Sequence, residues 1–385
     1  MKALSLFANI GVSEAYLKDV GIHIVLANEL DERRATLYSE IYPETKMICG
    51  DFTKKEIFDS LISESSLLDI DIIMATPPCQ GMSTAGQKKV NDERNKLIIN
   101  TVDLIEKISP KYIFIENVPD FLKTVIEYNK KKMLIPDLIT NRLEKNYIIK
   151  FNTIDTKDYS VPQSRKRTII LLSRRDQERI WTIPNKNDKH ITLKDAIGNI
   201  PSIDPFIKDV DEEELLEFFP QYYEKRDRAL KISKWNQPPV HIKRQVKAMM
   251  HTPTSCTAFD NKTFKPIKED GTVVKGFRNT YKRQNWNLPA YTVTMDNRKI
   301  SSQNNVHPGR FLGKDCNENE IYSDARSLTL YEIMKVMSLP DDWPIPSTTS
   351  EAFVRRIIGE GIPPLFTKQV FAKLKLSQKR QVRHA

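Results

Sequence analysis

Short apolar runs alternate with amphipathic stretches through the first 175 residues, and this alternation constrains the fold more than any other feature. Between the runs, residues 92–109 place Leu97, Leu104 and Ile108 on one helical face. Apolar runs separated by helices predict an α/β fold with a parallel sheet covered by helices. Ligands of such sheets bind beyond the carboxyl ends of the strands, so the residues after each run are the candidates for function. The runs are "KALSLF", "HIVLAN", "KMICG", "IDIIMAT", "YIFIENV", "NYIIKF" and "TIILLS".

The pattern changes near residue 180, where the chain becomes rich in proline, asparagine and charge. Helical periodicity returns with "SLTLYEIMKVMSLPDDW" and "TKQVFAKLKL". At 385 residues the chain is longer than a single hydrophobic core usually supports. We therefore predict a first domain over 1–180, a smaller second domain over 181–325, and a C-terminal segment over 326–385 that completes the first.

Composition excludes several classes of protein. No apolar run approaches the ~20 residues that span a bilayer, and the opening "MKALSLFANIGV" is interpreted as a strand rather than a signal peptide. The four cysteines are far apart and form no CxxC pair, so we expect neither a zinc site nor a disulfide framework. Phosphate-loop and HExxH motifs are also missing. We expect a cytoplasmic protein with no metal.

The positive charge is concentrated in one segment. Residues 221–310 hold 18 Lys and Arg against 6 Asp and Glu, whereas the whole chain has a net charge of +10. Aromatic and amide side chains are interleaved with these cations, as in "FRNTYKRQNWN". This pattern favours contacts with nucleic-acid phosphates and bases, although a solvated basic surface would have the same composition.

Candidate binding groups follow the first three strands. A glycine-containing turn, "FANIGV", follows the first, Glu29 the second and Asp51 the third. A carboxylate after a strand can bind ribose hydroxyls, as Glu29 would, and Asp51 could accept from an adenine amino group. Each acid alone could equally cap a helix. Together the three predict a nucleoside pocket.

Candidate catalytic groups follow the next strands. "TPPCQG" presents Cys79 after two prolines, which stiffen the turn and donate no N–H. A cysteine in this position is either a nucleophile or a small buried hydrophobe. The next strand ends in Glu116, and "QSRKR" supplies Gln163, Arg165 and Arg167. A thiol, an acid and two cations are therefore expected to converge.

With these residues in order, the chain resembles the cytosine carbon-5 DNA methyltransferases. "LSLFANIG" resembles their cofactor turn, "PPCQGMSTAG" their nucleophile loop, "ENV" the acid and "QSRKR" the arginine motif. Three later segments, "RQNWNLPAYTV", "RSLTLYEIMKVMSLPDDW" and "IGEGIPPLFTKQV", resemble later family motifs. The resemblance implies a Rossmann-like domain that depends on S-adenosylmethionine, with a smaller target-recognition domain over 181–325.

The resemblance also implies a mechanism. The Cys79 thiolate would attack carbon 6 of cytosine while Glu116 donates a hydrogen bond or proton at ring nitrogen 3. Carbon 5 would then accept the methyl group, lose its proton and release Cys79. Arg165 and Arg167 would favour the thiolate and hold the cytosine carbonyl, and Asn117 would shape the loop that carries the acid.

The cofactor contacts implied by the resemblance come from the first strands and the turn before Cys79. Phe7 would contact the adenine, Glu29 the ribose, and Asp51 the adenine amino group. Two positions depart from the family pattern: Asn9 replaces a glycine, and Glu360 replaces an asparagine in "GEGIPP". Asparagine tolerates a left-handed backbone, and we expect Glu360 either to point away or to accept from the cofactor's amino group. The predicted cofactor residues are Phe7, Asn9, Gly11, Glu29, Leu30, Asp51, Phe52 and Pro78.

Neither carbon can be reached inside a duplex, so the target base would be flipped out and covered by the segment after Cys79, which includes Ser83. The 115 residues between Arg167 and Arg283 leave room for target recognition in double-stranded DNA. Candidate DNA contacts are Ser83, Gln163, Arg226, Arg228, Lys243, Arg244, Arg278 and Arg298.

Two alternatives remain. Relatives that act on transfer RNA carry a Cys-Phe-Thr tripeptide, for which "SCTAFD" is the nearest match here. A catalytically silent, nucleic-acid-binding relative would lack the cysteine or the acid. The compact chain favours a monomeric modification enzyme of a restriction-modification system, with a restriction endonuclease as a genetic rather than a physical partner.

Overall fold

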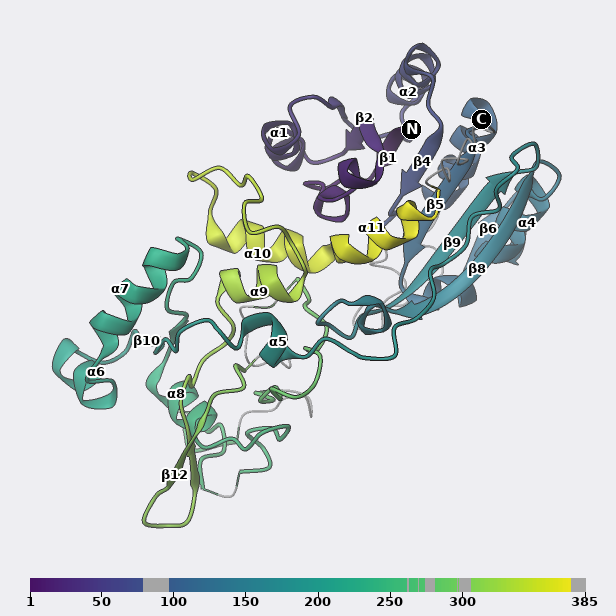
Figure 1. Ribbon diagram of the computed structural model, residues 1–385. Helices are drawn as coiled ribbons and strands as arrows, with labels where there is room; N and C mark the ends of the chain where they lie inside the picture. Colours follow the sequence, from purple (N-terminus) through teal and green to yellow (C-terminus); the bar gives the residue numbers. More distant parts are fainter. Residues whose placement is uncertain are drawn as a thin grey trace, which may run out of the picture.

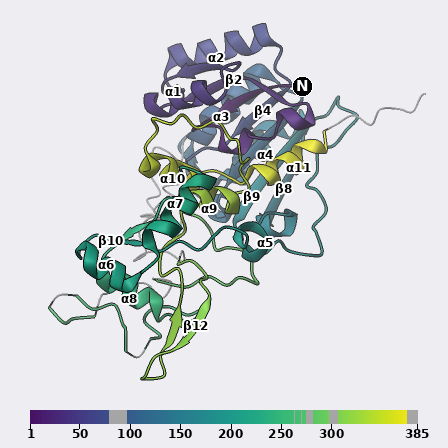
Figure 2. The same ribbon diagram turned by 60° about the vertical axis from the view of Figure 1, so that its left-hand side comes forward.

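The protein is described here from a computed structural model, in which residues 1–78, 97–261, 263–268, 270–273, 281–295, 297 and 306–374 are placed. The chain forms an elongated molecule (Figure 1). A sheet with its helices lies at one end, and the helices and hairpin of a second lobe lie at the other, with further helices between them (Figure 2). Every helix within these ranges is too short or too polar to span a bilayer.

The central sheet has seven strands in the order β3-β2-β1-β4-β5-β9-β8. All seven correspond to the apolar runs of the sequence, and neighbouring strands from β3 to β5 are parallel as predicted. The expectation of a wholly parallel sheet is wrong for β9, which runs antiparallel to both β5 and β8. The strands are β1 (Lys2–Leu6), β2 (His23–Glu29), β3 (Lys46–Cys49), β4 (Ile72–Ala75), β5 (Tyr112–Asn117), β8 (Tyr147–Asp155) and β9 (Lys166–Arg174).

Alternate residues of the strands pack into two different hydrophobic layers. One face packs against α2 (Lys55–Leu68), α3 (Leu97–Ile108) and α4 (Ile135–Leu143). The other packs against Trp181 and α11 (Pro364–Ala372). Burial on both faces explains why β4 and β5 are continuous apolar runs rather than alternating ones.

The edges of this domain carry shorter elements. The helix α1 begins after Asp31, whose side chain accepts from the backbone N–H of Arg34 and so caps the helix. A hairpin follows β5 and was not predicted from the sequence. These elements are η1 (Val12–Glu14), η2 (Lys18–Val20), α1 (Glu32–Ile41), η4 (Pro119–Lys123), β6 (Val125–Tyr128), β7 (Lys131–Leu134) and η5 (Thr156–Tyr159).

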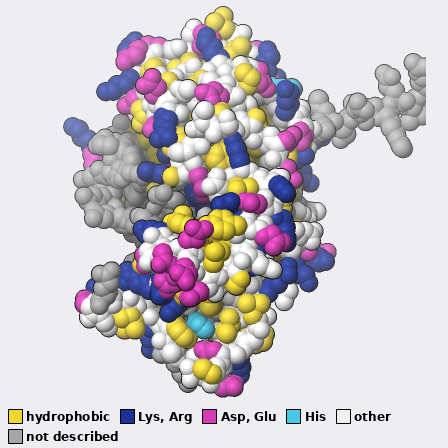
Figure 3. Space-filling view, turned by 90° about the vertical axis from the view of Figure 1, so that its left-hand side faces the viewer, with side chains coloured by type: hydrophobic (Ala, Val, Ile, Leu, Met, Phe, Trp, Pro, Cys, Tyr) yellow, Lys and Arg dark blue, Asp and Glu magenta, His cyan; other side chains and the backbone are white. Residues whose placement is uncertain are grey.

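The second lobe has a hydrophobic core of its own, which includes Ile207, Phe219, Val246 and Ala325. Its elements are β10 (Phe206–Ile207), α6 (Glu212–Phe218), α7 (Tyr222–Ile232), β11 (Val240–His241), α8 (Lys243–Met250), β12 (Phe311–Lys314) and β13 (Glu320–Tyr322). Three acidic residues, Glu212, Glu213 and Glu214, form the first turn of α6. Acidic and basic side chains share the face of the molecule on which α6 and α7 lie (Figure 3).

A further hydrophobic core joins the first domain to the second lobe. It contains buried residues of α5 (Leu193–Ile197), α9 (Leu330–Val336) and α10 (Glu351–Glu360), packed with Ile10 and Val12 of the first turn. Trp181 and α5 therefore pack with the first domain and the C-terminal helices. The boundary at 180/181 stays a prediction, but these contacts favour placing it nearer to Ile207.

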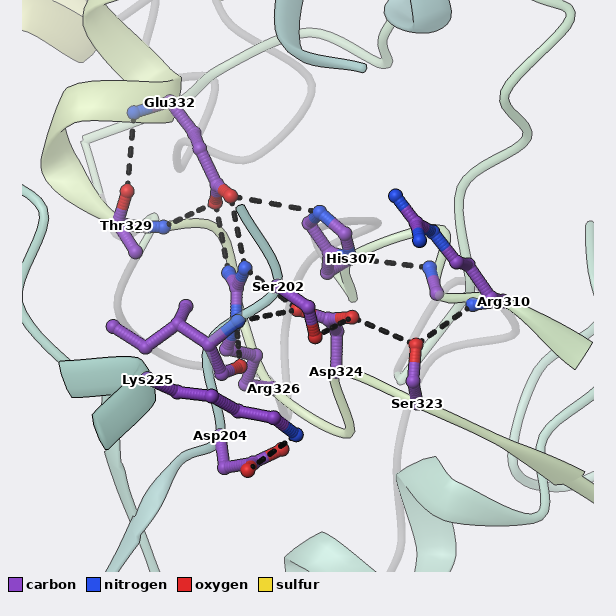
Figure 4. A network of polar contacts seen from close by, with 12 residues as sticks. Ser202, Asp204, Lys225, His307, Arg310, Ser323, Asp324, Arg326, Thr329 and Glu332 are labelled. Carbon is purple, nitrogen blue, oxygen red and sulfur yellow. Dashed lines mark hydrogen bonds and ion pairs between the residues drawn. The ribbon is translucent and has the colours of Figure 1, made fainter. Parts of the chain in front are cut away.

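A buried polar network connects the second lobe to α9 (Figure 4). The guanidinium of Arg326, which is fully buried, donates to both carboxylate oxygens of Glu332, at 2.8 and 2.9 Å, and to Asp324 at 3.0 Å. Asp324 also accepts from Ser202 and from the backbone of Ile203. The network thus fixes the segment that enters the second lobe, at Ser202 and Ile203, against α9, which follows that lobe in sequence.

Candidate active site

The side chain of Glu116 lies at the carboxyl end of β5, where only 8% of the residue is exposed. The Nε of Arg167 pairs with its Oε1 at 2.8 Å. Burial raises the pKa of Glu116, and the charges of Arg167 and Arg165 oppose this rise without cancelling it. A carboxyl that keeps its proton more readily than an ordinary glutamate can donate to a ring nitrogen.

The reversed direction of β9 explains how Arg167 reaches this acid. Glu116 is opposite Ile169 and Asn117 is opposite Thr168 in the antiparallel ladder. The beginning of β9 therefore lies beside the end of β5. In a wholly parallel sheet the arginine motif would have been at the other edge.

The two predicted catalytic arginines have different surroundings. Arg165 is 1% exposed, and its guanidinium donates to the backbone carbonyls of Val293, Gly359 and Glu360 at 2.7 to 3.3 Å. Its charge acts on Glu116, and its hydrogen bonds to these carbonyls hold two later segments of the chain. Arg167 pairs directly with the acid.

Asn117 connects the acid to the turn that precedes Cys79. Its Nδ2 donates to the carbonyl of Pro77 at 2.9 Å, and its Oδ1 accepts from the backbone of Val118. The role predicted for Asn117, shaping the loop of the acid, therefore extends to the proline turn. Cys79 and Ser83 lie outside the described residues, and Pro78 is the last described residue before them.

The first turn has an unusual backbone. Three alternate residues have positive φ: Phe7 at 59°, Asn9 at 53° and Gly11 at 75°. Left-handed conformations are rare for residues other than glycine and concentrate at functional sites. Asn9 therefore has the left-handed backbone that is expected where it stands in place of a glycine. A side chain at Gly11 would lie 2.2 Å from the ring of Tyr42, which excludes other residues from that position.

The groups predicted to bind a nucleoside lie around this turn. Both carboxylate oxygens of Glu29 accept from backbone N–H groups, of Asn9 at 2.8 Å and of Asp31 at 3.0 Å. Asp51 accepts from Thr53 through Oδ1 alone among the described residues, which leaves Oδ2 for a ligand. Each oxygen of Glu29 also keeps a lone pair.

Apolar surfaces accompany these acids. Leu30 is 68% exposed, an unusual exposure for a leucine beside a strand end. Phe7 packs edge-to-face against the buried Phe52, with 5.3 Å between ring centroids. An exposed leucine and a half-buried phenylalanine beside hydrogen-bond acceptors suit a flat apolar base and a ribose.

Glu360 does not point away from this turn, and its carboxylate is paired. Arg34 donates to both of its oxygens, at 2.7 and 3.1 Å, and the Nδ2 of Asn9 donates to Oε2 at 3.1 Å. Burial lowers the pKa of Arg34, but the hydrogen bonds and charge of Glu360 more than compensate and raise it. Sequence reasoning missed Arg34, for which the only signal was the unexpected acid at Glu360.

The predicted DNA contacts divide into buried, paired and undescribed residues. Gln163 is fully buried, donates to Met337 Sδ and accepts from the backbone of Val293. It is not available to DNA in this arrangement, because its amide already has partners inside the protein. Arg278 and Arg298 lie outside the described residues.

Four predicted contacts lie on the helices α7 and α8. Arg226 pairs with Asp227, Arg228 with Glu224 and Lys243 with Glu214. Arg244 is exposed and donates to the carbonyl of Ile267. Surface ion pairs of this kind are weak, so these cations can exchange their partners for phosphates.

In the part of the chain that the structure describes, no three His, Cys, Asp or Glu residues are grouped as metal ligands would be.

Comparisons with known proteins cover almost the whole chain. A family model described as C-5 cytosine-specific DNA methylase matches residues 1–376. The Type II methyltransferase M1.HgaI of Avibacterium volantium is 40% identical over 372 residues, which are 95% of this chain and 96% of the relative. M.XorII of Xanthomonas oryzae pv. oryzae, also a Type II methyltransferase, is 25% identical across 95% of this chain and 82% of its own length.

Solved structures agree in fold. A methyltransferase from E. coli, described as prophage-encoded and DNA-modifying, superposes with a TM-score of 0.65 at 18% identity, covering 97% of this chain and 98% of that one. A DNMT2 mutant of Spodoptera frugiperda gives a TM-score of 0.57 at 16% identity, with the same coverage of both chains.

Proposed function

The chain belongs to the C-5 cytosine-specific DNA methylases and is a DNA (cytosine-5-)-methyltransferase, and from this premise we propose that Cys79, Glu116 and Arg167 carry out its chemistry. The observation that carries the proposal is the buried contact between Glu116 and Arg167 at 2.8 Å, beside the turn that leads to Cys79. The target cytosine is flipped out of double-stranded DNA to reach these groups.

The proposed roles follow from the surroundings of each residue. Glu116, whose pKa is raised by burial, donates a proton to ring nitrogen 3 of cytosine while the Cys79 thiolate forms a bond to carbon 6. Arg167 orients Glu116 and binds the cytosine carbonyl through its other N–H groups. Asn117 keeps the proline turn against the acid. After methylation, the carbon-5 proton leaves, and the bond to Cys79 breaks as the ring regains its double bond.

S-adenosylmethionine, when bound, supplies the methyl group. Its nucleoside fits the acceptors and apolar surfaces at the ends of β1 to β3: Glu29 for the ribose, Asp51 for the adenine amino group, and Phe7 and Leu30 for the base. Arg165 has a positioning role in this proposal, because it holds the carbonyls of Gly359 and Glu360 beside the same pocket.

We propose that the second lobe recognises the DNA sequence and that the enzyme protects DNA in a restriction-modification system. Full-length similarity to a Type II methyltransferase supports this role, as does the basic composition of residues 221–310. Cations of α7 and α8, among them Arg226, Arg228 and Arg244, are the proposed phosphate or base contacts.

Bisulfite sequencing of plasmid DNA tests the proposal. The wild-type chain, Cys79→Ser and Glu116→Gln are expressed in a host without its own cytosine methyltransferase. We expect protected cytosines in one short recurring context for the wild type and none for either variant. Absence of protection with folded wild-type protein would refute DNA methylation, and transfer RNA from the same cells would then be sequenced. Protection that persists with Cys79→Ser would refute the assigned nucleophile.

A further inference from the structure

The side chains of Asn9, Arg34 and Glu360 form a polar group beside the proposed ribose site that the reaction chemistry does not use. They come from three distant elements: the first turn, the first turn of α1 and the last residue of α10. Asn9 joins this group to Glu29, because its backbone N–H donates to Glu29 Oε2 while its Nδ2 donates to Glu360 Oε2.

Tight packing holds Glu360 in this position. A Cβ on Gly359 would lie 2.2 Å from the carbonyl oxygen of Thr294, and one on Gly361 would lie 2.9 Å from the side chain of Val12. The two glycines therefore allow the end of α10 to approach both the first turn and residue 294. Arg165 fixes the same segment through its backbone carbonyls.

One acceptor in the group has no donor. Asn9 Oδ1 is buried and receives no hydrogen bond from any described residue. A buried, unsatisfied oxygen costs about 1–3 kcal/mol unless a ligand or water supplies the donor. The bond from Nδ2 to Glu360 fixes the amide orientation, so Oδ1 is the atom of this amide that still needs a donor.

Charge also favours a cationic donor. Arg34 is neutralised by its two bonds to Glu360, with Arg356 adding a longer ion pair at 3.9 Å. A carboxylate has about four acceptor sites, of which Arg34 and Asn9 occupy three. Glu29 and Asp31 add two further negative charges that act on Arg34. The open groups are therefore acceptors in a negative environment.

We infer that Asn9 Oδ1 and the Arg34-held carboxylate of Glu360 bind the α-ammonium of the amino-acid end of the cofactor. Asn9 bridges Glu29, the proposed ribose acid, and Glu360, so both acceptors lie next to the proposed ribose site. Asn9 and Glu360 thus compensate each other: the acid that would repel the cofactor's carboxylate recognises its ammonium instead. Arg34 is a positioning residue that keeps Glu360 directed at the first turn.

This inference rests on the proposed cofactor, and a binding experiment separates the two. Isothermal titration calorimetry without DNA compares S-adenosylhomocysteine with the analogue in which hydrogen replaces its α-ammonium. The wild type should prefer S-adenosylhomocysteine by about tenfold or more, the usual worth of a hydrogen bond to a charged group. Asn9→Gly and Glu360→Gln should each reduce this preference to about threefold or less.

A matched control lies on the far side of the domain. Glu106 accepts two hydrogen bonds from Arg142, as Glu360 does from Arg34, so Glu106→Gln removes an equivalent carboxylate and should leave the preference unchanged. Asn9→Gly suits the left-handed backbone, which guards against a folding defect. An unchanged preference in both Asn9→Gly and Glu360→Gln, or no preference in the wild type, overturns the inference alone. A wild type that binds neither compound overturns the proposed cofactor as well.

Discussion

At the scale of single residues, two arginines two positions apart have different tasks. Arg165 satisfies three backbone carbonyls and is 1% exposed, whereas Arg167 contacts the catalytic acid. The motif "QSRKR" predicts both as catalytic, because a sequence pattern does not show which cation turns toward the acid and which toward the neighbouring segments. The sequence also predicts Gln163 as a DNA contact, but its side chain is fully buried and does not reach the surface.

Substitution of the two arginines should separate stability from catalysis. Arg165→Ala leaves three carbonyls without their donors, so we expect a loss of about 3 kcal/mol or more in the free energy of unfolding. Arg167→Ala should lose less stability, because Glu116 can take up a proton, but should slow methyl transfer by about 100-fold or more. Urea denaturation and single-turnover methylation measure the two quantities. Equal stability losses in the two variants would contradict the assignment, and Arg175→Ala, on an exposed side chain, is the control.

Glu14 gives a prediction on pH. This acid is buried below the first turn, where it accepts from Ser5 and Tyr38, and burial raises its pKa from 4.5 to about 7 despite these hydrogen bonds. Between pH 4.5 and 7 the folded protein keeps a proton that the unfolded chain has lost. The stability from this group is therefore complete at low pH and decreases as pH rises, by up to about 3 kcal/mol.

The variant Glu14→Gln isolates this effect, because glutamine stays neutral and every other group titrates alike in both proteins. We expect the variant to gain stability relative to the wild type between pH 5 and pH 8, measured by urea denaturation at each pH. Stability curves that run parallel across this range would show that Glu14 is ionised in the folded state.

At the scale of elements, the sequence predicts the seven sheet strands because each coincides with a short apolar run, even in β3 and β8, which are largely not buried. It does not predict the direction of β9 or the hairpin of β6 and β7. Strand direction depends on the connection between β8 and β9, and "TKDYSVPQSRK" carries no pattern that fixes it. The strands β6 and β7 have only four residues each, of which Ile126 alone is buried, so their periodicity is weak. The pairing of Arg34 with Glu360 was equally hidden, since 325 residues separate them in sequence.

The helix α11 tests the prediction that the C-terminal segment completes the first domain. Phe371 packs against Trp181 and Phe114, with ring centroids 4.9 and 5.4 Å apart, and is fully buried. Phe371→Ala should therefore lower the free energy of unfolding by about 3–5 kcal/mol. Leu67→Ala on α2, where the side chain is 76% exposed, should change it by about 0.5 kcal/mol or less. A small effect of Phe371→Ala in urea denaturation would mean that α11 is not part of this core.

At the scale of the whole molecule, the charge of the second lobe is less available than its composition suggests. Lys225, Arg226, Arg228 and Lys243 each pair with a carboxylate, and Arg283 is buried among backbone carbonyls. The count of 18 cations in residues 221–310 is therefore an upper bound on the phosphate contacts of the lobe. Composition predicts the sign of the partner's charge, and the folded arrangement decides how many cations can meet it.

The network around Arg326 couples the two lobes, and its removal should separate their functions. Arg326→Met leaves Asp324 and Glu332 buried without their cation, a change that typically costs about 3–5 kcal/mol. The two uncompensated carboxylates lie at the junction with the second lobe, whereas the groups proposed to bind the cofactor belong to the first domain. We expect S-adenosylhomocysteine to bind within about threefold of wild type and DNA affinity to decrease by about tenfold or more. Calorimetry and a DNA titration at one salt concentration measure the two affinities.

The control for this variant is Lys225→Met, which breaks the neighbouring ion pair with Asp204, where the lysine is 26% exposed. It should weaken DNA binding less, because the second lobe keeps its attachment to α9. If Arg326→Met bound DNA as the wild type does, the lobe would hold its position through its hydrophobic contacts alone. If the variant lost cofactor and DNA together, the network would stabilise the whole protein rather than set the position of one lobe. Only the selective loss of DNA binding fits a junction that orients the recognition surface toward the catalytic groups.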